Sequence, residues 1–308
     1  ISDQNMLLSA DLAFKNITVA GERDFSISGK IAEINTSNKT IKELLPRVLG
    51  DKLPDVLDNA GKVSLNGNIY LDRNNINLQS DIRTQLGNLT TDLKMQDITN
   101  SENTSYQGKI IAKNFHLGRF LEQKILGRVT GAIDVKGKGF ILETVDNQID
   151  GKLQSFDFNG YSYQNILVSG SMTKPEFDGE IHIDDPNVKL SFEGSAALAA
   201  EIKKYDFKAQ IDYADLNVLQ LVTRDTLSVI KGNIELNAEG NTLDEMVGKL
   251  NFRNTSYQNH NDIYYFEDFT VTSEFNDRKV RTIAINSPDI IEGVFIGKYQ
   301  FKELGKIF

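Results

Sequence analysis

The sequence has no cysteine and only three histidines in 308 residues. No disulfide and no thiolate metal site can therefore form. The histidines, His116, His182 and His260, are far apart, and there is neither an HExxH motif nor a histidine pair at helical spacing. We therefore expect no metal and no cofactor, and we predict that His182, which alternates with Ile181 and Ile183, faces solvent.

Long apolar runs and clusters of basic residues are also missing. No stretch of about 18 apolar residues is present, so we expect no transmembrane segment in this sequence. The net charge of −9 argues against a nucleic-acid partner and against binding to anionic membranes by charge alone. The opening "ISDQNMLLSA" has no initiator Met and no charged region before an apolar core, so we expect a segment of a longer polypeptide.

Catalytic motifs are absent as well. There is no GxSxG elbow, no P-loop and no GxGxxG motif ahead of a helix. Most carboxylates occupy outward strand positions or helix caps, and Asp184 and Asp185 precede Pro186 and Asn187, as in a turn. We therefore predict that the protein is not an enzyme.

What the sequence does contain is alternation with a period of two. Residues 63–71 place valine, leucine, glycine and isoleucine on one face, with Ser, Asn and Tyr between them. Residues 181–183, 188–192 and 283–285 repeat the pattern, and breaks rich in Asn, Asp and Gly follow at short intervals. Such spacing is typical of antiparallel hairpins with one apolar and one polar face.

Helical patterns are few. Residues 40–57 begin with the spacing of a capping box, and Pro46 and Pro54 divide them into short pieces. Residues 114–126 and 215–227 each place leucine and other apolar residues on one helical face. The sequence predicts a few short amphipathic helices here.

An internal repeat gives the most specific signal. Residues 114–139 return 101 positions later with matched apolar and glycine positions. The matched pairs are Phe115 with Leu216, Phe120 with Leu221, Val129 with Ile230, Ile133 with Ile234, Val135 with Leu236, and Gly139 with Gly240. We predict one continuous repetitive β domain over residues 1–308, with approximate units 25–113, 114–204 and 205–308.

The glycines within the repeat allow two interpretations. They could kink strands, or allow bulges, so that a wide sheet bends into a trough. Gly61, Gly131 and Gly232 could instead end helices, a role that does not account for Gly67 and Gly137 inside the strands.

The stretch "GRVTGAIDVKGKGFILETVDNQIDGKLQSFDFNGYSYQNI" (127–166) resembles the repeating unit of the TamB and AsmA-like proteins of diderm bacteria. The shared pattern is a glycine-led alternating strand, G-x-G, a short L-x-x-L-like element, G-x-L and a strand ending in "FNGYxYxNI". Residues 232–254 repeat part of it.

This resemblance implies an elongated, curved, U-shaped antiparallel sheet, a β-taco with an apolar groove. It implies a middle segment of a periplasmic protein that is anchored to the inner membrane through a part absent here. The implied function is non-catalytic transport of phospholipid between the inner and outer membranes, linked to outer-membrane biogenesis. The implied partners are phospholipid and an Omp85-family (TamA-like) outer-membrane protein.

Two further functions remain open from the sequence. One is a scaffold that assists outer-membrane protein assembly by adding strands to an exposed sheet edge. The other is a closed β-sandwich that binds glycans or peptides, because a sheet that faces lipid and a sheet that faces another sheet alternate identically. The predicted groove-lining residues are Val63, Leu65, Ile69, Ile133, Val135, Ile181, Ile183, Leu190, Phe192, Ile234 and Leu236.

Overall fold

The computed structural model describes residues 7–19, 22–37, 40, 55–99, 102–139, 145–173, 176–197, 201–288, 290–298 and 300. These residues are almost entirely antiparallel β structure, with 17 strands in an open, curved sheet and very few helical residues. No second sheet covers the first within these described ranges, which leaves the closed β-sandwich without support. Contacts divide the chain into two units, Ile1–Ser169 and Gly170–Phe308.

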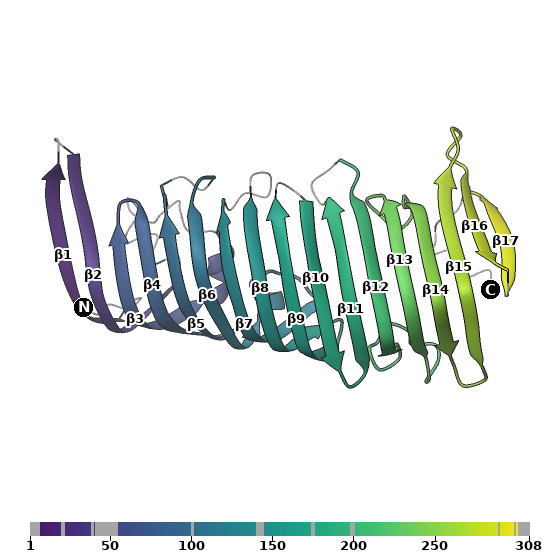
Figure 1. Cartoon of the computed structure of the whole chain (residues 1–308). Coiled ribbons are helices and arrows are strands. Elements are labelled where there is room, and N and C mark those ends of the chain that lie inside the picture. Colours follow the sequence, from purple (N-terminus) through teal and green to yellow (C-terminus); the bar gives the residue numbers. More distant parts are fainter. Residues whose placement is uncertain are drawn as a thin grey trace. The chain divides into compact units, whose positions relative to one another are not determined.

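Unit 1 is a meander in which each strand pairs with the next along the chain (Figure 1). Its strands are β1 (Leu7–Val19), β2 (Glu22–Ser37), β3 (Lys62–Asp72), β4 (Asn75–Thr84), β5 (Gly87–Gln96), β6 (Ser105–His116), β7 (Leu126–Lys138) and β8 (Asp146–Phe158). Strand β9 (Tyr161–Thr173) spans the division between the units.

Unit 2 repeats this arrangement, again with consecutive antiparallel pairs. Its strands are β10 (Glu176–Asp185), β11 (Val188–Ala197), β12 (Lys204–Asp215), β13 (Val229–Glu239), β14 (Val247–Gln258), β15 (Ile263–Phe275), β16 (Arg281–Ser287) and β17 (Ile291–Gly297). Only hydrogen bonds between chain neighbours are needed to build such a sheet, as the hairpin pattern of the sequence predicts.

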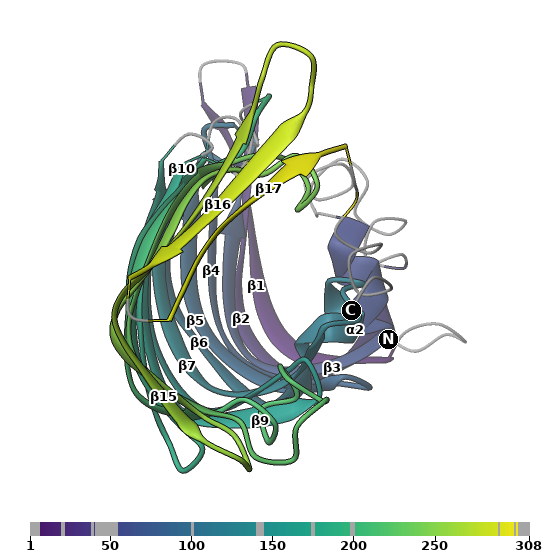
Figure 2. The ribbon, with the colours of Figure 1, turned by 90° about the vertical axis from the view of Figure 1, so that its right-hand side faces the viewer.

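β-Bulges recur near one end of the strands in both units. The pairing register shifts between Ile31 and Ile34 in β2, between Ala112 and Phe115 in β6, and between Ile211 and Ala214 in β12. A bulge adds an unpaired residue and bends its strand. Figure 2 shows the strands of each unit as arcs, and we call the end of each unit that carries these shifts the bulged end.

The best-packed part of unit 1 lies at this bulged end. Leu86, Phe115 and Val129 form a buried cluster, and only 4% of Phe115 is exposed. Helix α2 (Leu117–Phe120) closes over the cluster, and the Phe115 and Phe120 rings meet edge to face at 5.5 Å. The short 3-10 helix η1 (Asp55–Ala60) contacts α2, and Asn59 Nδ2 donates to the Phe120 carbonyl at 2.8 Å.

The helices predicted from the sequence are mostly wrong in extent. Within 114–126 only the four residues of α2 are helical, because residues 114–116 extend β6 instead. Residues 216–228 contain turns and no helix, although Leu219 is deeply buried among them. Of the predicted segment 40–57, residues 41–54 lie outside the described residues, and η1 covers its end.

The two interpretations of the glycines are resolved position by position. Gly61 follows η1 with φ of +68°, and its N–H donates to the Asp58 carbonyl, so it ends a helix. Gly131 and Gly232 instead lie inside β7 and β13. Gly232 has φ of +139° and lies against Thr255 of the neighbouring strand, as the strand-kink interpretation predicts.

Candidate functional site

Cross-strand pairing places apolar residues on one face of unit 1. Directly paired residues in an antiparallel sheet point to the same side. One row runs from Ile69 through Leu78, Leu93 and Gly108 to Val135. A second row follows the same strands and consists of Leu65, Ile82, Leu89, Ala112 and Gly131. We call this side the apolar face of unit 1.

Unit 2 has its own apolar face, built by the same rule. Ile181 pairs with Phe192, which pairs with Ala209 and then with Ile234. Phenylalanine is common here: the Phe192 and Phe207 rings lie 5.3 Å apart between centroids. Phe252, Phe266 and Phe269 form a second group, with centroid separations of 5.6 to 6.5 Å.

The structure brings the eleven predicted groove residues together on these two faces. Val63, Leu65, Ile69, Ile133 and Val135 lie on the apolar face of unit 1. Ile181, Ile183, Leu190, Phe192, Ile234 and Leu236 lie on the apolar face of unit 2. Sequence reasoning missed Leu78, Leu93, Phe207 and Phe252, although all four follow the same alternation and could have been found from it.

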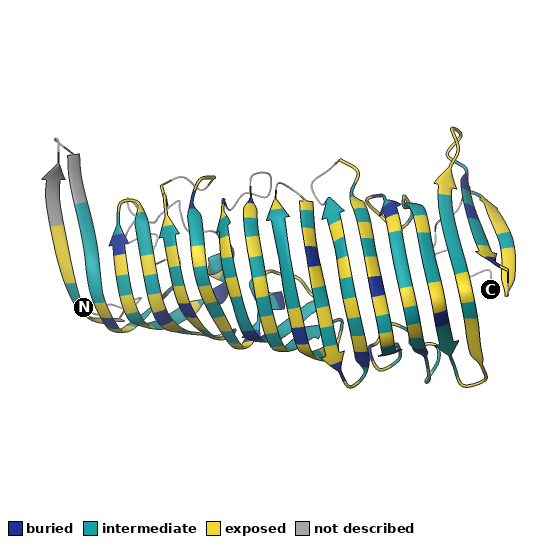
Figure 3. Cartoon of the chain, viewed as in Figure 1, coloured by how far each residue is buried: buried dark blue, intermediate teal, exposed yellow. Residues whose placement is uncertain are grey.

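All eleven of these residues are half-buried. A side chain beneath a second layer of structure loses almost all of its exposure, as Phe115 does under α2. The half-buried residues pack against neighbours on their own face, and no second layer of described structure covers them. In Figure 3 half-buried and exposed residues alternate in bands along the strands.

The accessible surface of the chain supports the same conclusion. It is 19486 Å² for a mass of 34.5 kDa. A compact monomer of this mass would expose roughly 12,900 Å², and two separate compact halves roughly 15,600 Å². A single-layer sheet exposes both of its faces and contributes to this excess.

Glycines on the apolar faces pair with large side chains on the neighbouring strands. Gly67 pairs with Ile31, Gly108 with Val135, and Gly194 with Phe207, so a residue without a side chain repeatedly stands opposite a large one. Ser80 and Thr91, which pair near the centre of the unit 1 face, are buried, and their hydroxyl oxygens lie 3.0 Å apart, within hydrogen-bond distance of each other. The resulting surface has shallow relief and little polarity at its centre.

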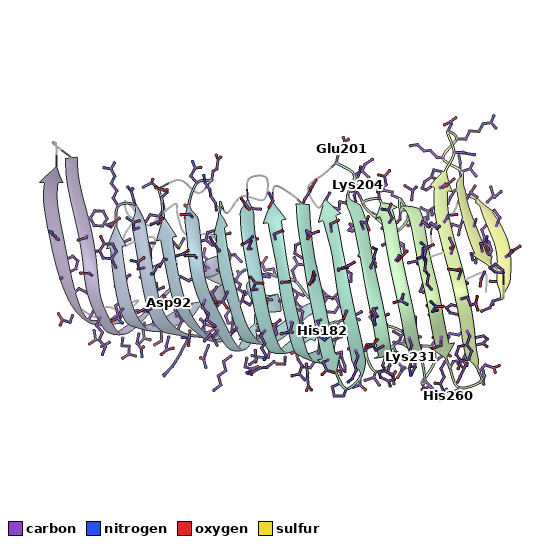
Figure 4. The ribbon with its side chains drawn as sticks, viewed as in Figure 1. Asp92, His182, Glu201, Lys204, Lys231 and His260 are labelled. Atoms are coloured by element: carbon purple, nitrogen blue, oxygen red, sulfur yellow. The ribbon has the colours of Figure 1, made fainter. Side chains whose placement is uncertain are left out.

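In both units the opposite face of the sheet is polar. Asp92 and His182, labelled in Figure 4, belong to it and are exposed. His182 faces solvent, as predicted, and its Nδ1 lies 2.9 Å from Ser191 Oγ. Exposed ion pairs such as Lys189–Asp184, at 3.1 Å, contribute little to stability.

The structure also places the remaining groups that could carry chemistry. His116 caps α2 by accepting a hydrogen bond from the Arg119 N–H at its Nδ1, and His260 contacts the Thr226 hydroxyl. Across the described ranges, no group of three His, Cys, Asp or Glu side chains could hold a metal ion. No helix in this part of the chain is long and apolar enough to cross a membrane.

The fold and the two faces define a class: an open, antiparallel β protein whose apolar faces, apart from the area under α2 at the bulged end of unit 1, have no covering layer among the described residues. No protein-family model, no curated protein and no solved structure matches the sequence. Its function must therefore be argued from the faces themselves.

Proposed function

We propose that the apolar faces bind the acyl chains of phospholipids and that the chain is a non-catalytic segment of a lipid conduit. The observation that carries the proposal is the half-buried state of the apolar side chains in both units. Soluble proteins rarely leave a large apolar surface open unless something binds there.

The energetics favour such a ligand. Each methylene removed from water contributes about 0.8 kcal/mol, so exposing a sixteen-carbon chain to water costs about 13 kcal/mol. A shallow apolar face recovers much of this energy without fixing one chain length. The eight strands of unit 2, at about 4.8 Å spacing, give a face about 34 Å long.

The setting of this function is part of the proposal. The resemblance of residues 127–166 to TamB and AsmA-like repeats supports a periplasmic location, an inner-membrane anchor elsewhere in the polypeptide, and an Omp85-family partner. The absence of a recognisable catalytic motif in the sequence supports a non-enzymatic role.

Photo-cross-linking from neighbouring residues of one strand tests the proposal. Leu93 and Asp92 are adjacent in β5 and point to opposite faces. With p-benzoylphenylalanine at either position and radiolabelled phospholipid, we expect adducts from position 93 and none from position 92. Equal labelling from both positions, or no phospholipid in native mass spectra of gently purified protein, would contradict the proposal.

Charge on the apolar face should remove lipid and leave the fold intact. We expect Ile133→Asp or Ile234→Asp to abolish lipid adducts with little change in β content by circular dichroism, because both residues are only half-buried. Cooperative unfolding of these variants would show instead that the face is an ordinary core.

The edge strand β17 supports a second candidate function. Strand β17 pairs with β16 and with no other described strand, and Val294 and Ile296 are 60% and 70% exposed on the face that is polar elsewhere. This supports a scaffold that accepts an added strand at this edge. A Val294→Pro variant should lose binding of unfolded outer-membrane protein if that function is correct, and unchanged binding would reject it.

A further inference from the structure

Residues 113–128, which run from the end of β6 through α2 to the start of β7, differ in charge from the chain as a whole. Residues 113–128 contain four basic residues, Lys113, Arg119, Lys124 and Arg128, and one acidic residue, Glu122. With neutral histidine their sum is +4 − 1 = +3, in a chain whose net charge is −9. Positive charge is therefore concentrated in the segment that contains α2.

The basic side chains of this segment differ in their surroundings. Arg119 and Lys124 are exposed, and among the described residues neither takes part in an ion pair. Arg128 lies in β7, where its Nη1 donates to the Asn114 carbonyl at 2.8 Å and its backbone N–H donates to Asp157 Oδ2 at 3.2 Å.

The neighbouring histidine responds to this positive charge. Burial lowers the pKa of His116, and the charges of Arg119 and Arg128 lower it further, against a smaller opposing effect of Asp157. A positive potential around α2 is the expected cause of such an effect.

The same segment borders the apolar face of unit 1. Leu117 and Phe120 of α2 pack against the buried cluster, together with Leu89, Ala112 and Leu153 of the apolar face. Leu121 and Ile125, between the basic residues, remain 41% and 49% exposed. Figure 2 shows α2 on the hollow side of the arcs of unit 1.

The internal repeat provides a comparison within the molecule. At the positions 101 residues later, Gln220 replaces Arg119, Asp225 replaces Lys124 and Val229 replaces Arg128. Residues 214–229 contain one basic residue and two acidic ones, a sum of +1 − 2 = −1. The positive charge is thus not a general property of the repeat.

We propose that Arg119 and Lys124 bind the headgroup of an anionic phospholipid whose acyl chains lie on the adjacent apolar face of unit 1. This inference rests on the proposed function and adds a headgroup class and an orientation to it. Guanidinium and ammonium groups donate charge-assisted hydrogen bonds to phosphate oxygens, and the apolar face lies directly beside them.

Charge reversal tests the inference on the full chain. The variant R119E/K124E is compared with K136E/K152E, which makes the same change in net charge at exposed positions on the polar face of unit 1. Each protein is incubated with vesicles of phosphatidylglycerol or of phosphatidylcholine, re-isolated, and its retained lipid is counted by native mass spectrometry. We expect R119E/K124E to retain about tenfold less phosphatidylglycerol and an unchanged amount of phosphatidylcholine, with no effect in K136E/K152E.

Several results would overturn this assignment. Equal losses in the two double variants would show a general charge effect. Loss of both lipids in R119E/K124E would show that α2 only supports the structure, and displacement of phosphatidylglycerol by inorganic phosphate would show a simple anion site. If the wild-type protein retains neither lipid, the proposed function itself fails, which separates the two claims.

Discussion

At Gly67 in β3, the backbone of the neighbouring strand β4 occupies the space that a Cβ atom would need. A Cβ atom there would lie 2.1 Å from the Gln79 carbonyl oxygen, and φ is +149°, a conformation that only glycine adopts readily. Close strand approach on the apolar face therefore depends on the absence of a side chain at this residue.

A Gly67→Ala substitution should destabilise the fold by about 2–3 kcal/mol, because both the conformation and the contact become unfavourable. The measurement is the midpoint of urea unfolding. Gly293→Ala is the control, since a Cβ atom at Gly293 would meet nothing within 4 Å. Similar midpoint shifts for both variants would contradict the argument.

His116 makes the α2 region sensitive to acid. Its Nδ1 must be unprotonated to accept the hydrogen bond from the Arg119 N–H, and its pKa is lowered in the folded state, first by burial and then by Arg119 and Arg128. A lowered pKa in the folded state means that the unfolded chain binds the proton more tightly.

Stability should therefore be complete above about pH 6.5, the ordinary histidine value, and should fall as the pH drops through the lower folded value. Thermal unfolding from pH 7.5 to 5 checks this. The variant His116→Asn keeps a capping oxygen and cannot titrate in this range, so its pH dependence should be weaker. Identical profiles would rule out His116 as the source.

At the scale of the element, the bulges divide the strands into two parts with different roles. At the bulged end of unit 1, side chains such as Leu86 and Phe115 are buried under α2. Beyond the bulges, residues such as Leu93 are half-buried on the apolar face. We therefore expect most of the stability to come from the bulged end, and acyl-chain binding, in the proposed function, to lie beyond it.

Two leucine substitutions separate these roles. Leu86→Ala removes a buried contact and should cost about 2–4 kcal/mol, whereas Leu93→Ala should cost about 1 kcal/mol. Urea unfolding gives both values, and lipid retention should fall in Leu93→Ala alone. Equal stability costs would show that the apolar face is packed like the buried cluster.

The same division explains what the sequence could predict. Period-two alternation, which gives Val63, Leu65 and Ile69 a common face, is a local property that the hairpin fold preserves, so the antiparallel sheet was predictable. Residues 114–126 and 215–227 show helical periodicity, but strand pairing at the bulged end takes Phe115 into β6 and Asp215 into β12. Such long-range competition is not encoded in a local pattern.

Of the candidate site, the apolar faces were predictable from the sequence, whereas the charged region around α2 was not. Ile133 and Ile234 were placed in strands by the 101-residue repeat, and the pairing register puts each on an apolar face. The net charge of −9 averages over the chain and so hides the positive charge around α2. Its significance depends on the contact of Leu117 and Phe120 with the sheet, which only the structure provides.

At the scale of the whole molecule, the accessible surface exceeds that of compact proteins of equal mass. The native protein should therefore bind an apolar dye such as anilinonaphthalene sulfonate, and added phospholipid should displace it. Dye fluorescence under native conditions is the measurement, and Ile234→Asp should lower it. Native fluorescence no higher than that of a compact globular protein would contradict the open faces.

Pairing of each strand with its chain neighbour within each unit has an evolutionary consequence. A duplicated hairpin can be inserted at any turn between two strands. Its two strands keep the antiparallel order and form hydrogen bonds with the strands on either side of the insertion. Residues further along the chain keep their own partners. The sheet of such a molecule can therefore become longer or shorter by whole hairpins, while the remaining strands keep their sequences and their pairing.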